Sequence, residues 1–175
     1  MNPTGLAAVF VGTLLLKPAE PPRSDPAACG LEHVKTVGEL QSTLSRRAVE
    51  IVALASGASP DREARLAHLV ASKATFALGS GDVGRPLDTG VPGAIGLAKM
   101  MNADSYRFYL WSYIPTPEAN PCGKAEVKVE FINGQKENSY PVTFTFEAGR
   151  LLDAQGWTQW FASGPIGTPD EAPAR

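Results

Sequence analysis

The sequence predicts an α+β fold, because helical patterns fill its first part and strand patterns its second. Apolar residues recur at helical spacing up to about residue 101, and from residue 104 they alternate with polar ones. Turn residues separate the alternating stretches, as in an antiparallel meander. We expect one domain over residues 32–162, with N-terminal helices packed on an antiparallel sheet of about four strands or more.

Residues 1–31 are expected to precede this domain as an apolar segment and a Pro-rich linker, the linker over residues 17–28. The apolar run over residues 6–16 suits the hydrophobic region of a secretory signal peptide and is shorter than the roughly 20 residues of a membrane-spanning helix. No Lys or Arg precedes the run and no small-x-small cleavage site follows it, so a packed or poorly ordered segment is the alternative. We therefore expect a periplasmic or secreted protein, or otherwise a cytoplasmic one, without a stable membrane span.

Cys29 and Cys122 are the two cysteines of the chain. In an exported protein such an even pair is a candidate disulfide, whereas in the cytosol the same pair indicates two unrelated thiols. The pairing and the export prediction therefore depend on each other. The sequence has no metal-site spacing, and we expect neither a metal nor a cofactor.

Three helices are expected before residue 104. Residues 36–39 (TVGE) form a capping box, which starts a helix that Gly57 ends. Residues 59–61 (SPD) supply a cap, a first-turn proline and an acidic residue for the positive end of a second helix. The inner stripe of that helix would hold Leu66, Leu69, Val70 and Lys73. A third helix over residues 92–101 contains two glycines, which weaken it.

Four strands are expected after residue 104. Residues 106–114 are aromatic and β-prone, residues 127–131 and 142–146 alternate apolar with polar, and a last strand covers about residues 151–161. Asn133-Gly134 and Ala148-Gly149 supply turns between them. Residues 163–175 lack an apolar period and are expected to form a mobile tail.

The stretch GSGDVG at residues 79–84 matches the GxGxxG pattern of a dinucleotide-binding turn. Such a turn needs a helix directly after the third glycine, whereas here Arg85 and Pro86 follow and the proline disfavours a helical Arg85. We expect the glycines to form a turn between the second and third helices, and we expect no nucleotide cofactor. A net charge of -2 also argues against nucleic acid as a partner.

The order of the expected helices and strands and two local patterns carry a resemblance to a known family. The stretch TFTFEAGRLL is similar to the strand-Gly-strand that closes its domains, and ATFALGSGD with GVPGAIGLAKMM is similar to its loop into the third helix. Over about residues 32–161 the chain resembles the nuclear transport factor 2-like superfamily, which includes the SnoaL-like, polyketide-cyclase-like group. The resemblance implies a cone, in which a strongly curved antiparallel sheet wraps around the helices and leaves a pocket, and it implies a homodimer. Fold alone leaves the chemistry open.

Enzymes of this family set an Asp or His proton shuttle against a Tyr or Asp donor. The candidate catalytic residues here are Asp82, Asp153 and Tyr109. Asp82 would lie in the loop at the mouth of the cone, where bracing the glycine-rich turn is its alternative role. His68 lies away from the apolar stripe of its helix and His33 lies in linker-like sequence, so we expect both at the surface.

Aromatic residues are the richest source of binding candidates. In the first strand, Tyr106 and Phe108 share one face, and Tyr109, Trp111 and Tyr113 share the other. One face should meet the helices or a pocket and the other could pack in a dimer, while an ordinary core with a few exposed rings is the alternative. The candidate ligand-binding residues are Asp82, Tyr109, Trp111, Tyr113, Phe144 and Trp157.

The sequence leaves three functions open. The first is an exported domain that binds a small apolar or aromatic molecule in a pocket between helices and sheet. The second is an isomerase, dehydratase or hydrolase of the polyketide-cyclase-like kind, which would use a pocket Asp and Tyr. The third is a homodimerisation module that works through its exposed sheet face, which a large apolar patch there would favour.

Overall fold

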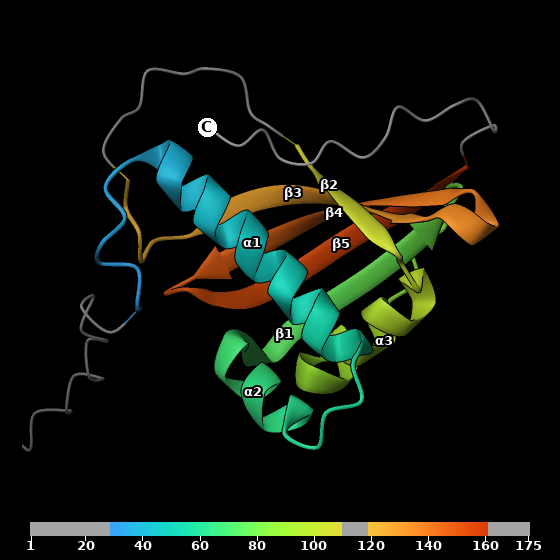
Figure 1. Ribbon diagram of the computed structural model, residues 1–175, viewed down its shortest axis with the longest axis horizontal. Coiled ribbons are helices and arrows are strands. Elements are labelled where there is room, and N and C mark those ends of the chain that lie inside the picture. Colours follow the sequence, from blue (N-terminus) through green and yellow to red (C-terminus); the bar gives the residue numbers. More distant parts are fainter. Residues whose placement is uncertain (1–28, 110–118, 161–175) are drawn as a thin grey trace, which may run out of the picture.

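The computed structural model describes residues 29–109 and 119–160, which form three helices on one face of a curved five-stranded sheet (Figure 1). The strand order is β1-β5-β4-β3-β2. In chain order the elements are α1 (Val37–Ser56), α2 (Arg62–Leu69), β1 (Val70–Ser80), α3 (Gly90–Met101), β2 (Ser105–Phe108), β3 (Ala125–Asn133), the short 3-10 helix η2 (Gly134–Lys136), β4 (Asn138–Glu147) and β5 (Arg150–Trp160). The expected α+β fold is confirmed.

The capping box starts α1 as predicted. The Thr36 hydroxyl accepts a hydrogen bond from the Glu39 backbone at 3.2 Å, and the Glu39 carboxylate accepts from the backbone of Lys35 and Thr36 at 2.9 and 3.1 Å. These backbone hydrogen bonds, Lys35 first, lower the pKa of Glu39 below its usual value. Gly57 ends the helix. The predicted apolar face is buried and contains Leu40, Leu44, Ala48, Ile51 and Ala55.

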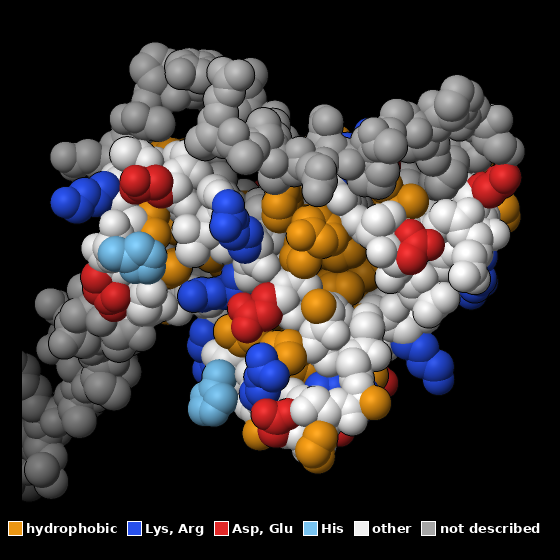
Figure 2. All heavy atoms as spheres, viewed as in Figure 1, with side chains coloured by type: hydrophobic (Ala, Val, Ile, Leu, Met, Phe, Trp, Pro, Cys, Tyr) orange, Lys and Arg blue, Asp and Glu red, His pale blue; other side chains and the backbone are white. Residues whose placement is uncertain are grey.

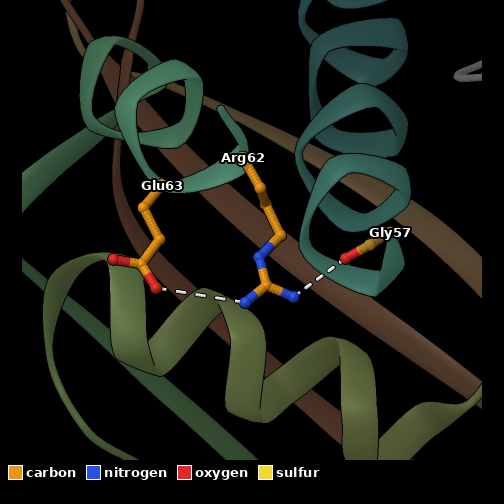
Figure 3. Close-up of polar contacts among 3 residues, drawn as sticks. All are labelled: Gly57, Arg62 and Glu63. Carbon is orange, nitrogen blue, oxygen red and sulfur yellow. Dashed lines mark hydrogen bonds and ion pairs between the residues drawn. The ribbon is translucent and has the colours of Figure 1, made fainter. Parts of the chain in front are cut away.

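The start of α2 differs from the prediction. The helix begins after Asp61, which makes no side-chain cap, and the Ser59 hydroxyl donates to the Asp61 carboxylate instead of capping. Arg62 fixes the connection to α1, because its Nη1 donates to the Gly57 carbonyl at 2.8 Å (Figure 3). Its Nη2 lies 4.0 Å from the Glu63 carboxylate.

Strand β1 was not predicted, and it corrects two expectations. The helical stripe was expected to continue through Val70 and Lys73, but the chain turns extended at Val70 and runs parallel to β5. The sheet is therefore mixed, with an antiparallel part over β5-β4-β3-β2. The parallel partner of β1 lies some 80 residues away in the sequence, and no turn residues next to β1 indicate this pairing. The strand is therefore hard to predict from the sequence.

The glycine-rich stretch GSGDVG begins in the last two residues of β1 and turns the chain back along this strand. Ser80 and Val83 exchange backbone hydrogen bonds at 3.0 and 3.3 Å, and Leu78 donates to the Arg85 carbonyl at 3.0 Å. Gly81 has a φ of +59°, which a glycine adopts without steric cost. The turn thus lies between β1 and α3 rather than between two helices. No helix starts directly after Gly84, as Arg85 and Pro86 predicted, since α3 begins only at Gly90.

The antiparallel register separates a buried inner face from a polar outer face. Val127 pairs with Phe144, which pairs with Ala154, and all three are buried on the inner face against the helices. The Ala148-Gly149 turn is confirmed, with φ values of 48° and 71°. At the predicted Asn133-Gly134 turn the chain forms η2, where the Lys136 backbone donates to the buried Asn133 side chain at 3.0 Å and the Gly134 backbone donates to the Asp104 carboxylate at 2.8 Å.

Cys29 and Cys122 form a disulfide, with their Cα atoms 5.7 Å apart. The disulfide joins the start of the described chain to the segment before β3. Ala148 donates to the Cys122 carbonyl at 3.0 Å, and Arg47 of α1 donates to the Gly149 carbonyl at 2.7 Å. The disulfide, α1 and the β4–β5 turn therefore meet at one end of the sheet. None of the helices in the described ranges is long and apolar enough to cross a membrane.

Candidate functional site

The outer face of the sheet carries rows of polar side chains set by the strand register. One row joins Glu126, Thr145, Asp153 and Thr75, and the next joins Lys128, Thr143 and Gln155. A third row places Trp157 between Pro141 and Gly79. These side chains line a groove of ≈ 440 Å³ over β3, β4 and β5, together with Gln159. The volume lies within the range of small-molecule sites.

Trp157 lies flat over β1 in this groove. A Cβ atom at Gly79 would overlap carbons of the Trp157 ring, so the ring rests on the strand where no side chain intervenes. The indole is nevertheless 44% exposed. Its other surface is therefore open to solvent, and the predicted role of Trp157 in ligand binding stays a prediction.

The candidate catalytic groups do not converge. Asp153 accepts a hydrogen bond from the Thr75 hydroxyl, and Tyr109 lies beside β3 with its ring 4.6 Å from Lys128 Nζ. Three strand spacings separate Tyr109 from Asp153 across the sheet, which is about 14 Å. Asp82 is exposed in the turn after β1 and does not line the groove. Trp111 and Tyr113 lie outside the described residues.

Tyr109 is half-exposed in a charged environment. Burial of its ring, and secondly the nearby Glu130 carboxylate, raise the pKa of Tyr109 above the usual value of a phenol. Glu130 also forms an ion pair with Arg107 at 3.3 Å. Tyr109 thus keeps its proton at neutral pH and can donate a hydrogen bond at the edge of the sheet.

Phe144 lies on the inner face and is fully buried in the core, where its ring contacts Phe131 edge-on at 6.0 Å. Its predicted place in a binding site requires a ligand on the helix-covered side. Tyr106 and Phe108 share this inner face, as predicted, with ring centroids 5.3 Å apart. Tyr106 is 45% exposed, and Figure 2 shows hydrophobic side chains gathered beside α1 on this side of the molecule. The helices thus leave part of the apolar face accessible.

A buried polar pair lies on the same inner face. Asn138 donates through Nδ2 to the Tyr140 hydroxyl at 3.3 Å, and both side chains are buried. The Asn138 Oδ1 atom is buried without a hydrogen-bond partner. Trp160 pairs directly with Asn138 across β4 and β5 and is 77% exposed. An unsatisfied carbonyl therefore lies among aromatic side chains at the end of the sheet.

Sequence reasoning missed this polar pair. Asn138 and Tyr140 follow the Asn133-Gly134 turn, where polar residues are ordinary, and no local pattern marks an asparagine as buried. His33 and His68 are exposed, as predicted. Among residues 29–109 and 119–160, no three His, Cys, Asp or Glu side chains cluster closely enough to hold a metal ion.

Comparison with solved structures gives several matches at low sequence identity. An NTF2-like protein of unknown function from Silicibacter pomeroyi aligns at 12% identity, covering 67% of this chain and 94% of that one, with a TM-score of 0.43. The chain is similar to NTF2-like proteins. An NTF2-like protein of unknown function from Mesorhizobium loti aligns at 15% identity over 70% and 93% of the two chains, also with a TM-score of 0.43. A cystatin-like fold protein from Burkholderia xenovorans aligns at 11% identity over 72% and 96%, again at 0.43.

Two of these three proteins are described as NTF2-like, the family that the sequence resembles. No protein-family model matches the chain, and no curated protein does so either. At this identity and TM-score we transfer no residue role from the aligned proteins.

Proposed function

We propose that the chain is an exported domain that binds a small molecule with an apolar or aromatic body and a hydrogen-bond donor. The proposed site lies between the helices and the inner face of the sheet, beside Asn138, Tyr140 and the exposed ring of Trp160, and it extends two strands across the sheet to the exposed ring of Tyr106. The observation that carries the proposal is the buried Asn138 Oδ1 atom without a partner.

An unpartnered buried carbonyl is costly. Leaving such an acceptor without a hydrogen bond costs about 1–3 kcal/mol, which a ligand N–H or O–H donor can recover. Asn138 is held in place by its hydrogen bond to Tyr140, so the acceptor is oriented before a ligand arrives. Trp160 is the exposed neighbour of Asn138 and is the side chain that can move aside to admit a ligand.

The apolar part of the ligand would contact the aromatic rings of the inner face. The Tyr106 side chain lies on the helix-covered face of β2 and is nevertheless 45% exposed. Its ring contacts the ring of Phe108. Aromatic rings prefer offset or edge-to-face contacts with one another, which favours an aromatic ligand. The site thus joins one directional polar contact to a larger apolar surface, the usual composition of small-molecule sites.

The export part of the proposal is supported by the disulfide. Disulfides persist in oxidising compartments and are rare in the cytosol. Thiol titration of protein isolated under native conditions is expected to find no reactive thiol before reduction. Two reactive thiols before reduction, one from each cysteine, would contradict export.

Phenol and anisole form a matched pair of probes for the site, since both carry one aromatic ring and only phenol donates a hydrogen bond. Titration calorimetry is expected to give phenol an affinity about tenfold higher than anisole, equal to about 1.4 kcal/mol. In Asn138→Leu the preference should vanish because the acceptor is gone, and weak binding of both probes should remain. Gln159→Leu on the outer face is the control and should keep the preference.

Two results would refute the proposal. One is equal affinity of the unmodified protein for phenol and anisole, and the other is a preference that survives in Asn138→Leu. The urea midpoint of each variant is measured alongside, to confirm that it is folded. The enzyme hypothesis needs an Asp and a Tyr within hydrogen-bond reach of each other. Asp153 and Tyr109 lie three strand spacings apart, and Tyr113, the other expected donor, lies outside the described residues, so this hypothesis stays a prediction. The dimer hypothesis stays a prediction, and the outer groove is lined mainly by polar side chains rather than by an apolar patch.

A further inference from the structure

The outer groove lies on the opposite side of the sheet from the site proposed above, and its chemistry is different. We propose that this groove is a second binding site, which takes a neutral saccharide. One sugar ring would stack on Trp157, and its hydroxyl groups would bond to the side chains of Gln155, Gln159 and Thr143. The proposal does not depend on the inner-face site, because the two share no side chain.

Trp157 has the geometry of a stacking platform. Its ring rests on the backbone of β1 at Gly79, where any side chain would displace it, and it remains 44% exposed. Pro141 lies beside it in the same row of the sheet. The indole is therefore a flat apolar surface fixed by the strands beneath it. The C–H face of a sugar ring is the apolar surface of an otherwise polar ligand and can stack on such an indole.

The polar groups nearest to the ring are uncharged. Gln155 and Gln159 flank Trp157 at two positions before and after it on β5, so all three point to the outer face. Thr143 pairs with Gln155 from β4. Amide and hydroxyl groups both donate and accept hydrogen bonds, as sugar hydroxyl groups do. This neighbourhood matches a ring that carries several hydroxyl groups.

The charges of the groove argue against a cation or an anion on the ring. Asp153 lies four residues from Trp157, about 13 Å along the backbone of β5, and it already accepts from the Thr75 hydroxyl and, at 3.5 Å, from the Gln155 amide. A cationic ligand on the indole would have no carboxylate from β5 within reach. Lys128 lies over the Tyr109 ring on the far side of the groove. A neutral ligand is therefore favoured on Trp157.

The length of the groove suits more than one sugar ring. The lining residues run along β5 from Asp153 to Gln159, a distance of about 20 Å for an extended strand. The groove encloses ≈ 440 Å³ and is open along one side. A linear oligosaccharide can lie along it with one ring on Trp157 and the next toward Thr145.

Titration calorimetry of the full chain with maltotriose, cellotriose, xylotriose and chitotriose tests the proposal. At least one trisaccharide is expected to bind with a Kd of about 1 mM or below. Trp157→Leu should weaken that binding about tenfold or more, because the stacking surface is lost. Gly79→Ala keeps the indole but displaces it, and should also weaken binding. Trp160→Leu removes an exposed tryptophan from the other face of the sheet and is the matched control, with no expected change.

Gln155→Ala provides a second test at an exposed position where folding is not at risk, and about a threefold loss of affinity is expected. The proposal is overturned if none of the four sugars binds at about 10 mM, or if binding is the same in Trp157→Leu and the unmodified protein. A loss confined to Trp160→Leu also overturns it. Phenol binding in Trp157→Leu should be unchanged, so failure here is distinguishable from failure at the inner face.

Discussion

Replacing Cys29 and Cys122 together by serine is expected to destabilise the folded chain by about 4–5 kcal/mol. The disulfide joins residues 93 positions apart in the sequence. Opening a loop of about this length returns roughly 4.7 kcal/mol of conformational free energy to the unfolded chain. Both cysteines are replaced, so no single thiol is left to react.

Loss of the disulfide should also loosen the packing around Cys29. The start of the described chain contributes Leu31 and Val34 to the core, with 0% and 4% of their surface exposed. Cys122 ties this segment to the β4–β5 turn, through the hydrogen bond from Ala148 to its carbonyl. Without the disulfide this end of the sheet should open first, before the β3–β4–β5 core.

Urea unfolding followed by circular dichroism measures the effect. With a slope of about 2 kcal/mol per M, the midpoint should fall by roughly 2 M in the double variant. Reduction of the unmodified protein should give a similar fall, and the double variant should not respond to reductant. Equal midpoints for the oxidised and reduced protein would refute the reasoning, because a closed loop of this length must stabilise the folded state.

Three smaller perturbations test other parts of the fold. Ala148→Asn should raise the free energy of unfolding by about 0.5–1 kcal/mol, because Ala148 has a positive φ that asparagine tolerates better; a lower urea midpoint would contradict this. Asn133→Ala should lower the free energy of unfolding by about 1–3 kcal/mol. The buried Asn133 amide donates to the Asn102 carbonyl at 2.8 Å and accepts from the Lys136 backbone at 3.0 Å, and both contacts would be lost. An unchanged urea midpoint would count against these contacts. The pKa of Glu39 is lowered in the folded protein, so the Glu39 carboxylate stabilises the fold at any pH above the ordinary carboxyl pKa of 4.5. This stabilisation is lost as the pH falls through the lowered pKa. Melting curves of Glu39→Gln should therefore depend less on pH in the acid range, and an identical pH dependence would speak against the capping box.

The elements marked by local chemistry could be predicted from the sequence. The capping box and the periodic apolar residues fixed the start and the buried face of α1, because both depend only on neighbours within one or two turns. The Ala148-Gly149 turn was predicted in the same way. Strand β1 was missed because Leu69 and Val70 continue a helical stripe, and its partner β5 is distant in the sequence.

The candidate sites could be predicted only in part. Trp157 and Asp153 were found by residue type, but the groove that holds them arises from cross-strand register, which no local pattern encodes. Phe144 was expected to bind a ligand and is fully buried in the core, because its strand faces the helices along its whole length. Asn138 carries the proposed function, yet only the burial of its unpaired oxygen marks it, and burial is a property of the folded state.

The side-chain amide resonance of Asn138, followed by heteronuclear NMR while phenol is added to isotope-labelled protein, tests the proposed site most directly. The account predicts that this resonance and those of Tyr140 and Tyr106 shift together and saturate, with much smaller shifts for anisole. An Asn138 amide that stays unchanged while phenol saturates other residues, or while no residue responds, would contradict the proposed site.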